Sequence, residues 1–218
     1  MKKATLLFIT FLFASSLSVW AQTNTATKDP KKILQSVSQK ISDLKSLKAN
    51  FALHLMAANG KTTQSQKGSF QMKGTKYRVT LADQEIICDN KVVWTFLKSI
   101  NEVQISAYNP SEQTISPAKL FTDFYDKEYN SRYAGSRTVN GKKCDIIELI
   151  PKQQQVQFSK IELAVDNTYT IVGGNVYEKN GNHYRYEISN FTPNATIAEE
   201  TFTFDANKHP GVEVIDLR

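Results

Sequence analysis

The chain has 218 residues, a formal net charge of +6 at pH 7 and only two cysteines. This length suits one domain with a sizeable core. The basic residues are mostly scattered lysines without an arginine-rich run, which argues against a nucleic-acid partner. The positive charge is typical of ordinary surface solvation, with attraction to an acidic partner or an anionic membrane surface as the alternative.

The first 21 residues have the features of a cleaved secretory signal peptide. A basic start and an uncharged apolar stretch over residues 4–17 precede a small-x-small cleavage pattern at residues 19–21. The apolar stretch is shorter than the ~20 residues that a membrane-spanning helix needs. Because Gln22 follows the expected cut and is not a cysteine, we expect a soluble exported product without a lipid anchor. Residues 22–218 are then one domain, and loss of two lysines lowers the net charge from +6 to +4.

An amphipathic helix is expected after a short polar leader. Asp29 is a favourable N-cap, and Pro30 stands at the first helical position, where proline is preferred. Apolar residues then recur at spacings of three and four, which predicts a helix of about 16 residues that ends near Leu47. Its apolar positions are Ile33, Leu34, Val37, Ile41 and Leu44.

From residue 51 onward the apolar pattern changes to a period of two, which is typical of β-strands. Asn-Gly pairs at 59–60, 140–141 and 180–181 predict hairpin turns. A second, short helix is expected from Pro117 to Tyr125. The pattern predicts an α+β, mainly β fold: a highly curved antiparallel sheet of about ten or eleven strands. It would form an unclosed barrel covered by the two helices.

The two cysteines, Cys88 and Cys144, both fall in predicted strands. In an oxidising compartment they could pair, and the closed loop of about 56 residues would contribute ~4 kcal/mol. The alternative is two buried thiols that act as small hydrophobic side chains. The sequence leaves both alternatives open.

No catalytic or metal-binding pattern is recognisable. The three histidines, His54, His183 and His209, lie far apart and none has a metal-ligand spacing to another ligand residue. The sequence has no G-x-S-x-G motif and no phosphate-binding glycine loop. We therefore expect no enzymatic activity, no metal and no cofactor, and an uncharacterised hydrolase is the least favoured alternative.

The large apolar residues allow two interpretations. Many fall on one parity of strands that are consecutive in the sequence, so they could form an ordinary core. They could instead line a hydrophobic chamber for acyl chains, in which each buried methylene contributes ~0.8 kcal/mol. The candidate lining residues are Ile33, Val37, Ile41, Phe51, Leu53, Phe70, Met72, Trp94, Phe96, Val103, Ile105, Leu120, Phe121 and Phe124.

Several segments, in this order, resemble the LolA-type outer-membrane lipoprotein carriers in their Bacteroidota-like form. They are L-K-A-N-F (47–51), G-S-F-Q-M-K (68–73), C-D-N-K-V-V-W-T-F (88–96), E-V-Q-I (102–105), P-A-K-L-F (117–121) and E-L-I-P-K (148–152). The resemblance implies a periplasmic carrier that shields lipoprotein acyl chains. Its partners would be the acylated cargo, an inner-membrane ABC-type exporter and an outer-membrane acceptor, and we expect it to be a monomer.

One position departs from this family. Better-known members have an Arg-Pro pair after the strand that matches residues 68–73, and its arginine helps to hold the lid shut. Here Gly74-Thr75 stands in that place, and Arg78 is the nearest arginine. An envelope-stress sensor or adaptor that recognises a protein partner, or another lipid-binding protein on the same fold, is therefore the alternative function.

Overall fold

The computed structural model describes residues 28–109 and 128–218. It contains one twelve-stranded sheet with the order β12-β6-β5-β4-β3-β2-β1-β11-β10-β9-β8-β7. The strands are β1 (Leu47–Met56), β2 (Thr62–Lys73), β3 (Lys76–Thr80), β4 (Gln84–Cys88), β5 (Val92–Leu97), β6 (Glu102–Ala107), β7 (Tyr129–Val139), β8 (Lys142–Pro151), β9 (Phe158–Asp166), β10 (Ile171–Glu178), β11 (His183–Pro193) and β12 (Glu213–Asp216).

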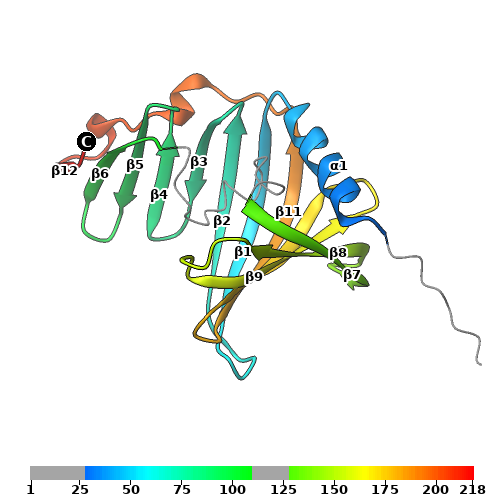
Figure 1. The fold of residues 1–218 in the computed structure, drawn as a ribbon. Coiled ribbons are helices and arrows are strands. Elements are labelled where there is room, and N and C mark those ends of the chain that lie inside the picture. Colours follow the sequence, from blue (N-terminus) through cyan, green and yellow to red (C-terminus); the bar gives the residue numbers. More distant parts are fainter. Residues whose placement is uncertain (1–27, 110–127) are drawn as a thin grey trace, which may run out of the picture.

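The predicted fold class is confirmed. Neighbouring strands are antiparallel except for the β12–β6 pair, which is parallel. The sheet curves strongly, so that β3–β6 and β7–β9 face different directions, and helix α1 lies against its hollow side (Figure 1). The structure has twelve strands where the sequence predicted about ten or eleven.

Helix α1 (Pro30–Ser42) begins as predicted but ends earlier. The Asp29 side chain accepts a hydrogen bond from the Lys31 backbone N–H at 2.9 Å, which satisfies one of the free donors of the first turn. The prediction of an end near Leu47 was wrong, because Leu47 is already the first residue of β1. Three apolar side chains of the helix, Ile33, Leu34 and Val37, are buried against the sheet.

The Asn-Gly hairpins are confirmed at all three predicted places. At the β7–β8 turn both Asn140 and Gly141 have positive φ, of 49° and 75°, a conformation that favours these two residue types. In the C-terminal region, two short 3₁₀ helices, η2 (Glu199–Phe202) and η3 (Ala206–Lys208), precede β12. The predicted helix at 117–125 and the signal peptide lie outside the described residues.

The pairing register separates two faces of the sheet. Side chains of directly paired residues point to the same side, so the face can be followed from strand to strand. We call the side on which α1 packs the inner face and the opposite side the outer face. The inner face carries the main core, whose buried members include Leu34, Leu47, Phe51, Phe70, Val79, Ile147, Leu149, Ile161, Leu163 and Tyr186.

Candidate functional site

The inner face is lined by apolar side chains from α1 and most of the strands. Half of the fourteen predicted chamber residues lie here: Phe51, Phe70, Met72, Ile33 and Val37 are buried, and Ile41 and Leu53 are partly buried. Leu120, Phe121 and Phe124 lie outside the described residues. The inner face thus brings together the predicted residues of α1, β1 and β2.

Part of this apolar face is incompletely buried. Ten hydrophobic side chains pack against the core while retaining exposure: Ile41, Leu44, Leu53, Tyr77, Ile86, Tyr133, Val156, Tyr184, Ile188 and Phe191. Most were not among the predicted lining residues. The sequence alternation places Tyr184 and Ile188 on one side of their strand, but it does not tell which side faces α1.

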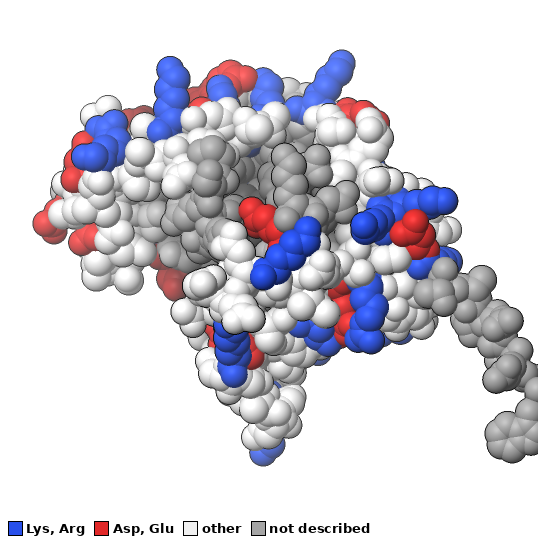
Figure 2. Space-filling model, viewed as in Figure 1, with Lys and Arg blue, Asp and Glu red and all other residues white. Residues whose placement is uncertain are grey.

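The inner face also carries buried phenols that remain uncharged. Burial raises the pKa of Tyr129 to about 12 and raises that of Tyr186 further. Both rings therefore stay neutral at physiological pH and add no charge to the apolar lining. Lys and Arg side chains stand along the upper margin of this side of the molecule (Figure 2).

One charged contact lies at the margin of this side, where α1 begins. The Lys28 ammonium contacts the Asp145 carboxylate at 2.7 Å, and Tyr133 and Ser136 donate hydrogen bonds to the same carboxylate. Burial alone would raise the pKa of Asp145, but the hydrogen bonds from Lys28, Ser136 and Tyr133 lower it. The contact joins the residue before the helix to strand β8.

Four predicted chamber residues lie on the wrong face. Trp94 pairs with Ile87 and Phe96 pairs with Glu85, while the inner-face residue Val79 pairs with Ile86. Ile87 and Glu85 are therefore on the outer face, and so are the residues paired with them. Since Val103 and Ile105 pair with Phe96 and Trp94, the whole set Trp94, Phe96, Val103 and Ile105 is outside the inner face.

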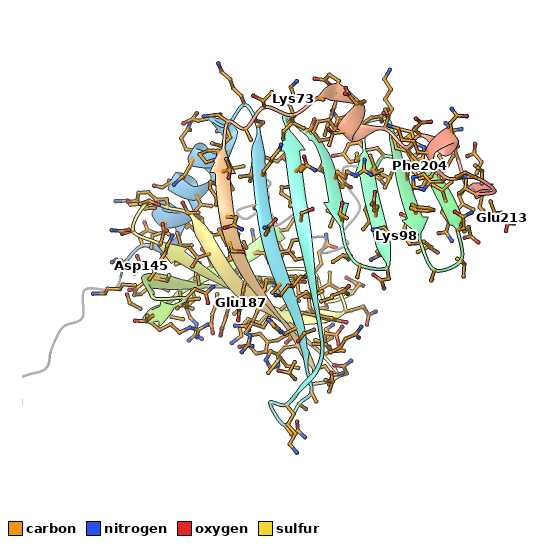
Figure 3. All side chains as sticks on the ribbon, turned by 180° about the vertical axis from the view of Figure 1, so that it is seen from behind. Lys73, Lys98, Asp145, Glu187, Phe204 and Glu213 are labelled. Carbon is orange, nitrogen blue, oxygen red and sulfur yellow. The ribbon has the colours of Figure 1, made fainter. Side chains whose placement is uncertain are left out.

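Phe96, one of these outer residues, is covered by the chain that follows β11. The Phe96 ring lies 5.2 Å from the Phe204 ring and 4.4 Å from the His209 ring, and Phe202 is fully buried. Figure 3 shows this segment, with Phe204, crossing the outer side of β3–β6. Phe96 is thus packed beneath a C-terminal cover, and it lies with Trp94 on the face opposite α1, whereas the sequence prediction placed both residues on the face that the helices cover.

Charged contacts fix the same cover to the sheet. Lys73 and Lys76, on either side of the β2–β3 turn, both contact Glu199 of η2. Their hydrogen bonds lower the pKa of Glu199 to about 2. Arg78 pairs with Glu85 and donates to the Thr201 carbonyl oxygen at 3.2 Å. Arg78 therefore points to the outer face and stands away from α1.

The departure at Gly74-Thr75 has a local explanation. These two residues form the β2–β3 turn, with Lys73 paired to Lys76, and Gly74 has a φ of 59°. Neither side chain replaces the arginine of the better-known carriers. Among the residues that the structure describes, the cations next to this turn are instead used to hold the C-terminal cover.

Cys88 and Cys144 do not form the disulfide that the sequence left open. Both are free and buried. Six strands separate β4 from β8 in the sheet order, and the two thiols belong to opposite faces. Burial raises the pKa of each thiol, so both are poorly reactive small hydrophobic groups.

Within residues 28–109 and 128–218, no three histidine, cysteine or acidic side chains come together as a metal site. In the same part of the chain, no helix has the length and apolar character needed to span a bilayer. A broad groove of about 970 Å³ lies on the outer face across β2, β1 and β11. Its lining includes Asn50, Ala52, Lys67, Ser69, Glu187 and Ser189.

Comparison with known proteins identifies the family. The family model described as "Outer membrane lipoprotein carrier protein LolA" matches residues 42–205. This chain belongs to the LolA family. Members of this family are carriers and not enzymes.

Individual relatives are distant. The outer-membrane lipoprotein carrier protein of Pasteurella multocida is 24% identical over 186 residues, covering 84% of this chain and 86% of that protein. The carrier of Actinobacillus succinogenes is 24% identical over 221 residues, covering 99% and 98%. An uncharacterized conserved protein from Thermus thermophilus has a similar fold, with a TM-score of 0.58, 12% identity and coverage of 85% and 98%.

Proposed function

We propose that this chain carries lipoproteins through the periplasm by holding their acyl chains against the inner face. It would receive them from an inner-membrane ABC-type exporter and deliver them to an acceptor at the outer membrane. The observation that supports this proposal is the row of partly buried apolar side chains on the inner face. An acyl chain needs apolar surface and no reacting groups, and each methylene removed from water contributes ~0.8 kcal/mol.

The proposal is tested with a fluorescent apolar dye that free fatty acid or a triacylated peptide displaces. Leu53→Gln places a polar group on the partly buried inner face and should weaken acyl-chain binding by about tenfold. Ile105→Gln is the matched control, because Ile105 is also partly buried but lies on the outer face. It should leave binding unchanged.

Two results would contradict the proposal. One is a folded wild-type protein that takes up no dye. The other is a loss of binding in Ile105→Gln equal to that in Leu53→Gln, which would locate the acyl chains on the outer face. Circular dichroism of both variants checks that the fold is retained.

A further inference from the structure

Among the described residues, four stretches of strand edge with at least four residues have no partner strand. Two are the ends of the sheet, β7 and β12. A third is the end of β11 beyond Glu187, where pairing with β10 stops. The fourth is the first part of β2, because pairing between β2 and β3 begins only at Ser69 with Thr80.

Three of these edges carry features that discourage the addition of a strand. β7 contains two arginines and a register irregularity next to Gly135, whose φ is 98°. β12 has only four residues, of which Glu213 and Asp216 are acidic. The end of β11 has Asn190 at a φ of 51° and stops at Pro193. Charges, bulges, short strands and proline are the usual means of protecting an exposed edge.

The edge of β2 from Gln64 to Gly68, here called the β2 edge, has only one of these features, the charge of Lys67. Its pairing with β1 is regular over these five residues, from Leu55–Gln64 to Phe51–Gly68. The sequence Q-S-Q-K-G contains no proline and one charge, and Gln64, Ser65 and Lys67 are exposed. Every second residue of such a strand turns its N–H and C=O toward the open side, so the β2 edge offers backbone groups for another strand.

The position of the β2 edge indicates what could bind there. Gln64 and Gln66 are paired with Leu55 and Leu53 of β1, and Leu53 is one of the partly buried side chains of the inner face. Adjacent strands lie about 4.8 Å apart. A chain bound along the β2 edge would therefore run two strand spacings, about 10 Å, from Leu53 and the proposed site of the acyl chains.

The β2 edge also continues into the outer groove. Lys67, Gly68 and Ser69 line this groove of about 970 Å³ together with Thr80, Leu81 and Ala82, at the point where β2 and β3 separate. Figure 3 shows the long β1–β2 hairpin extending away from the body of the sheet, and the side chains of Gln64, Ser65 and Lys67 on its edge are exposed. A polypeptide following the edge thus has a path from the acyl-chain face to the outer surface.

We propose that the β2 edge binds the polypeptide that directly follows the acylated residue of the cargo, as an added β-strand. This inference rests on the proposed function, since it concerns the protein part of the same lipidated ligand. Main-chain hydrogen bonds would supply the affinity, so the carrier would accept cargo with different sequences after the lipid.

Three synthetic probes test the inference: a triacylated cysteine amide, the same group with an eight-residue uncharged tail, and that lipopeptide with all tail amides N-methylated. We expect the tail to slow amide hydrogen exchange in residues 64–68 and to tighten binding about tenfold, because a few added hydrogen bonds supply this factor. N-methylation, which removes the donors, should abolish both effects.

A pair of adjacent proline substitutions supplies a matched control. Consecutive residues turn their N–H groups to opposite sides, so one of Ser65→Pro and Gln66→Pro removes a donor from the open side and the other removes a β1–β2 bond. The variant that loses the open-side donor should fold normally and bind the tail-less probe as before, but it should lose the effect of the tail. The variant that loses the β1–β2 bond should mainly have a lower free energy of unfolding.

The outcomes separate the two proposals. If the tail-less probe fails to displace the dye, the proposed function and this inference both fall. If it binds but the tail changes neither affinity nor exchange in residues 64–68, only the inference is overturned. A dimer seen by sedimentation in the wild type and lost in the open-side proline variant would assign the β2 edge to a second copy and overturn it as well.

Discussion

Over β3–β6 the outer face is covered by the C-terminal segment, whereas over β7–β10 it carries three buried carboxylates and no covering segment from residues 28–109 or 128–218. In the first half, Phe204 and His209 lie over Phe96, and Phe202 is fully buried in η2, which contacts β3. In the second half, Glu148, Glu162 and Asp166 are buried and paired with lysines and arginines. The same sheet is thus protected from water in two different ways.

The charged half depends on Lys160 in particular. Glu148 and Glu162 are paired directly across β8 and β9, a position in which like charges repel. The Lys160 ammonium contacts both carboxylates, at 2.8 and 3.1 Å, and lies 4.5 Å from the centre of the Tyr177 ring. Arg132 and Arg137 contact the same carboxylates from β7. In the apolar half a whole chain segment shields the outer face from water, whereas in the charged half the side chains of neighbouring strands do so.

The largest expected effect is on the apolar half. Phe202→Ala should lower the free energy of unfolding by about 3–5 kcal/mol, because it removes a fully buried ring and leaves a cavity beneath the cover. Urea unfolding followed by fluorescence measures this change. Ile100→Ala is the control: Ile100 is 61% exposed, so its truncation should change stability by no more than about 0.5 kcal/mol.

Thiol labelling locates the damage within the sheet. Cys88 belongs to β4 in the covered half and Cys144 to β8 in the charged half, and both are buried. In Phe202→Ala, labelling of Cys88 should accelerate more than labelling of Cys144. Equal acceleration of both thiols would show that the halves open together and would contradict a separate role for the cover.

A smaller loss is expected from Lys160→Met, which removes the shared cation but keeps the length of the side chain. We expect about 2–3 kcal/mol, less than for a fully broken buried pair because Arg132 and Arg137 remain. Lys61→Met, at an exposed lysine of the β1–β2 turn, is the control. Here Cys144 should become the faster-labelled thiol, and a variant as stable as the wild type would refute the role given to Lys160.

Sequence alone predicts the elements better than the site. The period of two, the Asn-Gly turns and the Asp29–Pro30 helix start are local signals, and the structure has them where they were expected. Alternation also places Trp94 and Phe96 on one side of β5 correctly. It does not reveal which side faces α1. The side of Phe96 that is covered is decided by the C-terminal segment, which lies about 100 residues later and has no regular apolar period.

The failed disulfide has a related cause. The spacing of Cys88 and Cys144 permits a loop of favourable length, but pairing requires neighbouring strands, and the sheet order is a global property. The buried carboxylates were missed for the same reason. Glu148 and Glu162 look like ordinary solvent-facing residues of alternating strands until the cross-strand partners Arg132 and Lys160 are known.

The smallest effect is expected from pH, and it again separates the halves. Burial alone would raise the pKa of Glu148, Glu162 and Asp166, but hydrogen bonds lower it in each case. The donors are Lys160 and Arg132 for Glu148, and Lys160 and Arg137 for Glu162. For Asp166 they are Thr168, Thr170 and Lys142. In the unfolded chain the pKa is ~4.3 for Glu and ~3.9 for Asp. Because the pKa of each group is lower than this in the folded protein, the ionised carboxylates stabilise the fold at a pH above the unfolded pKa. The contribution is lost as pH falls through the folded pKa.

We therefore expect the free energy of unfolding to be nearly constant from pH 7 to about 5 and to decrease below ~4.3. Glu162→Gln should reduce this acid-induced decrease, because one of the three carboxylates no longer titrates, while the exposed Glu213→Gln should not. Urea unfolding at pH 7, 5 and 3 measures the difference. Glu85 of the covered half also has a lowered pKa, since Arg78 and Lys98 outweigh its burial, so Glu85→Gln is the remaining comparison. If Glu85→Gln reduces the acid-induced decrease more than Glu162→Gln does, the charged half is not the main source of acid sensitivity.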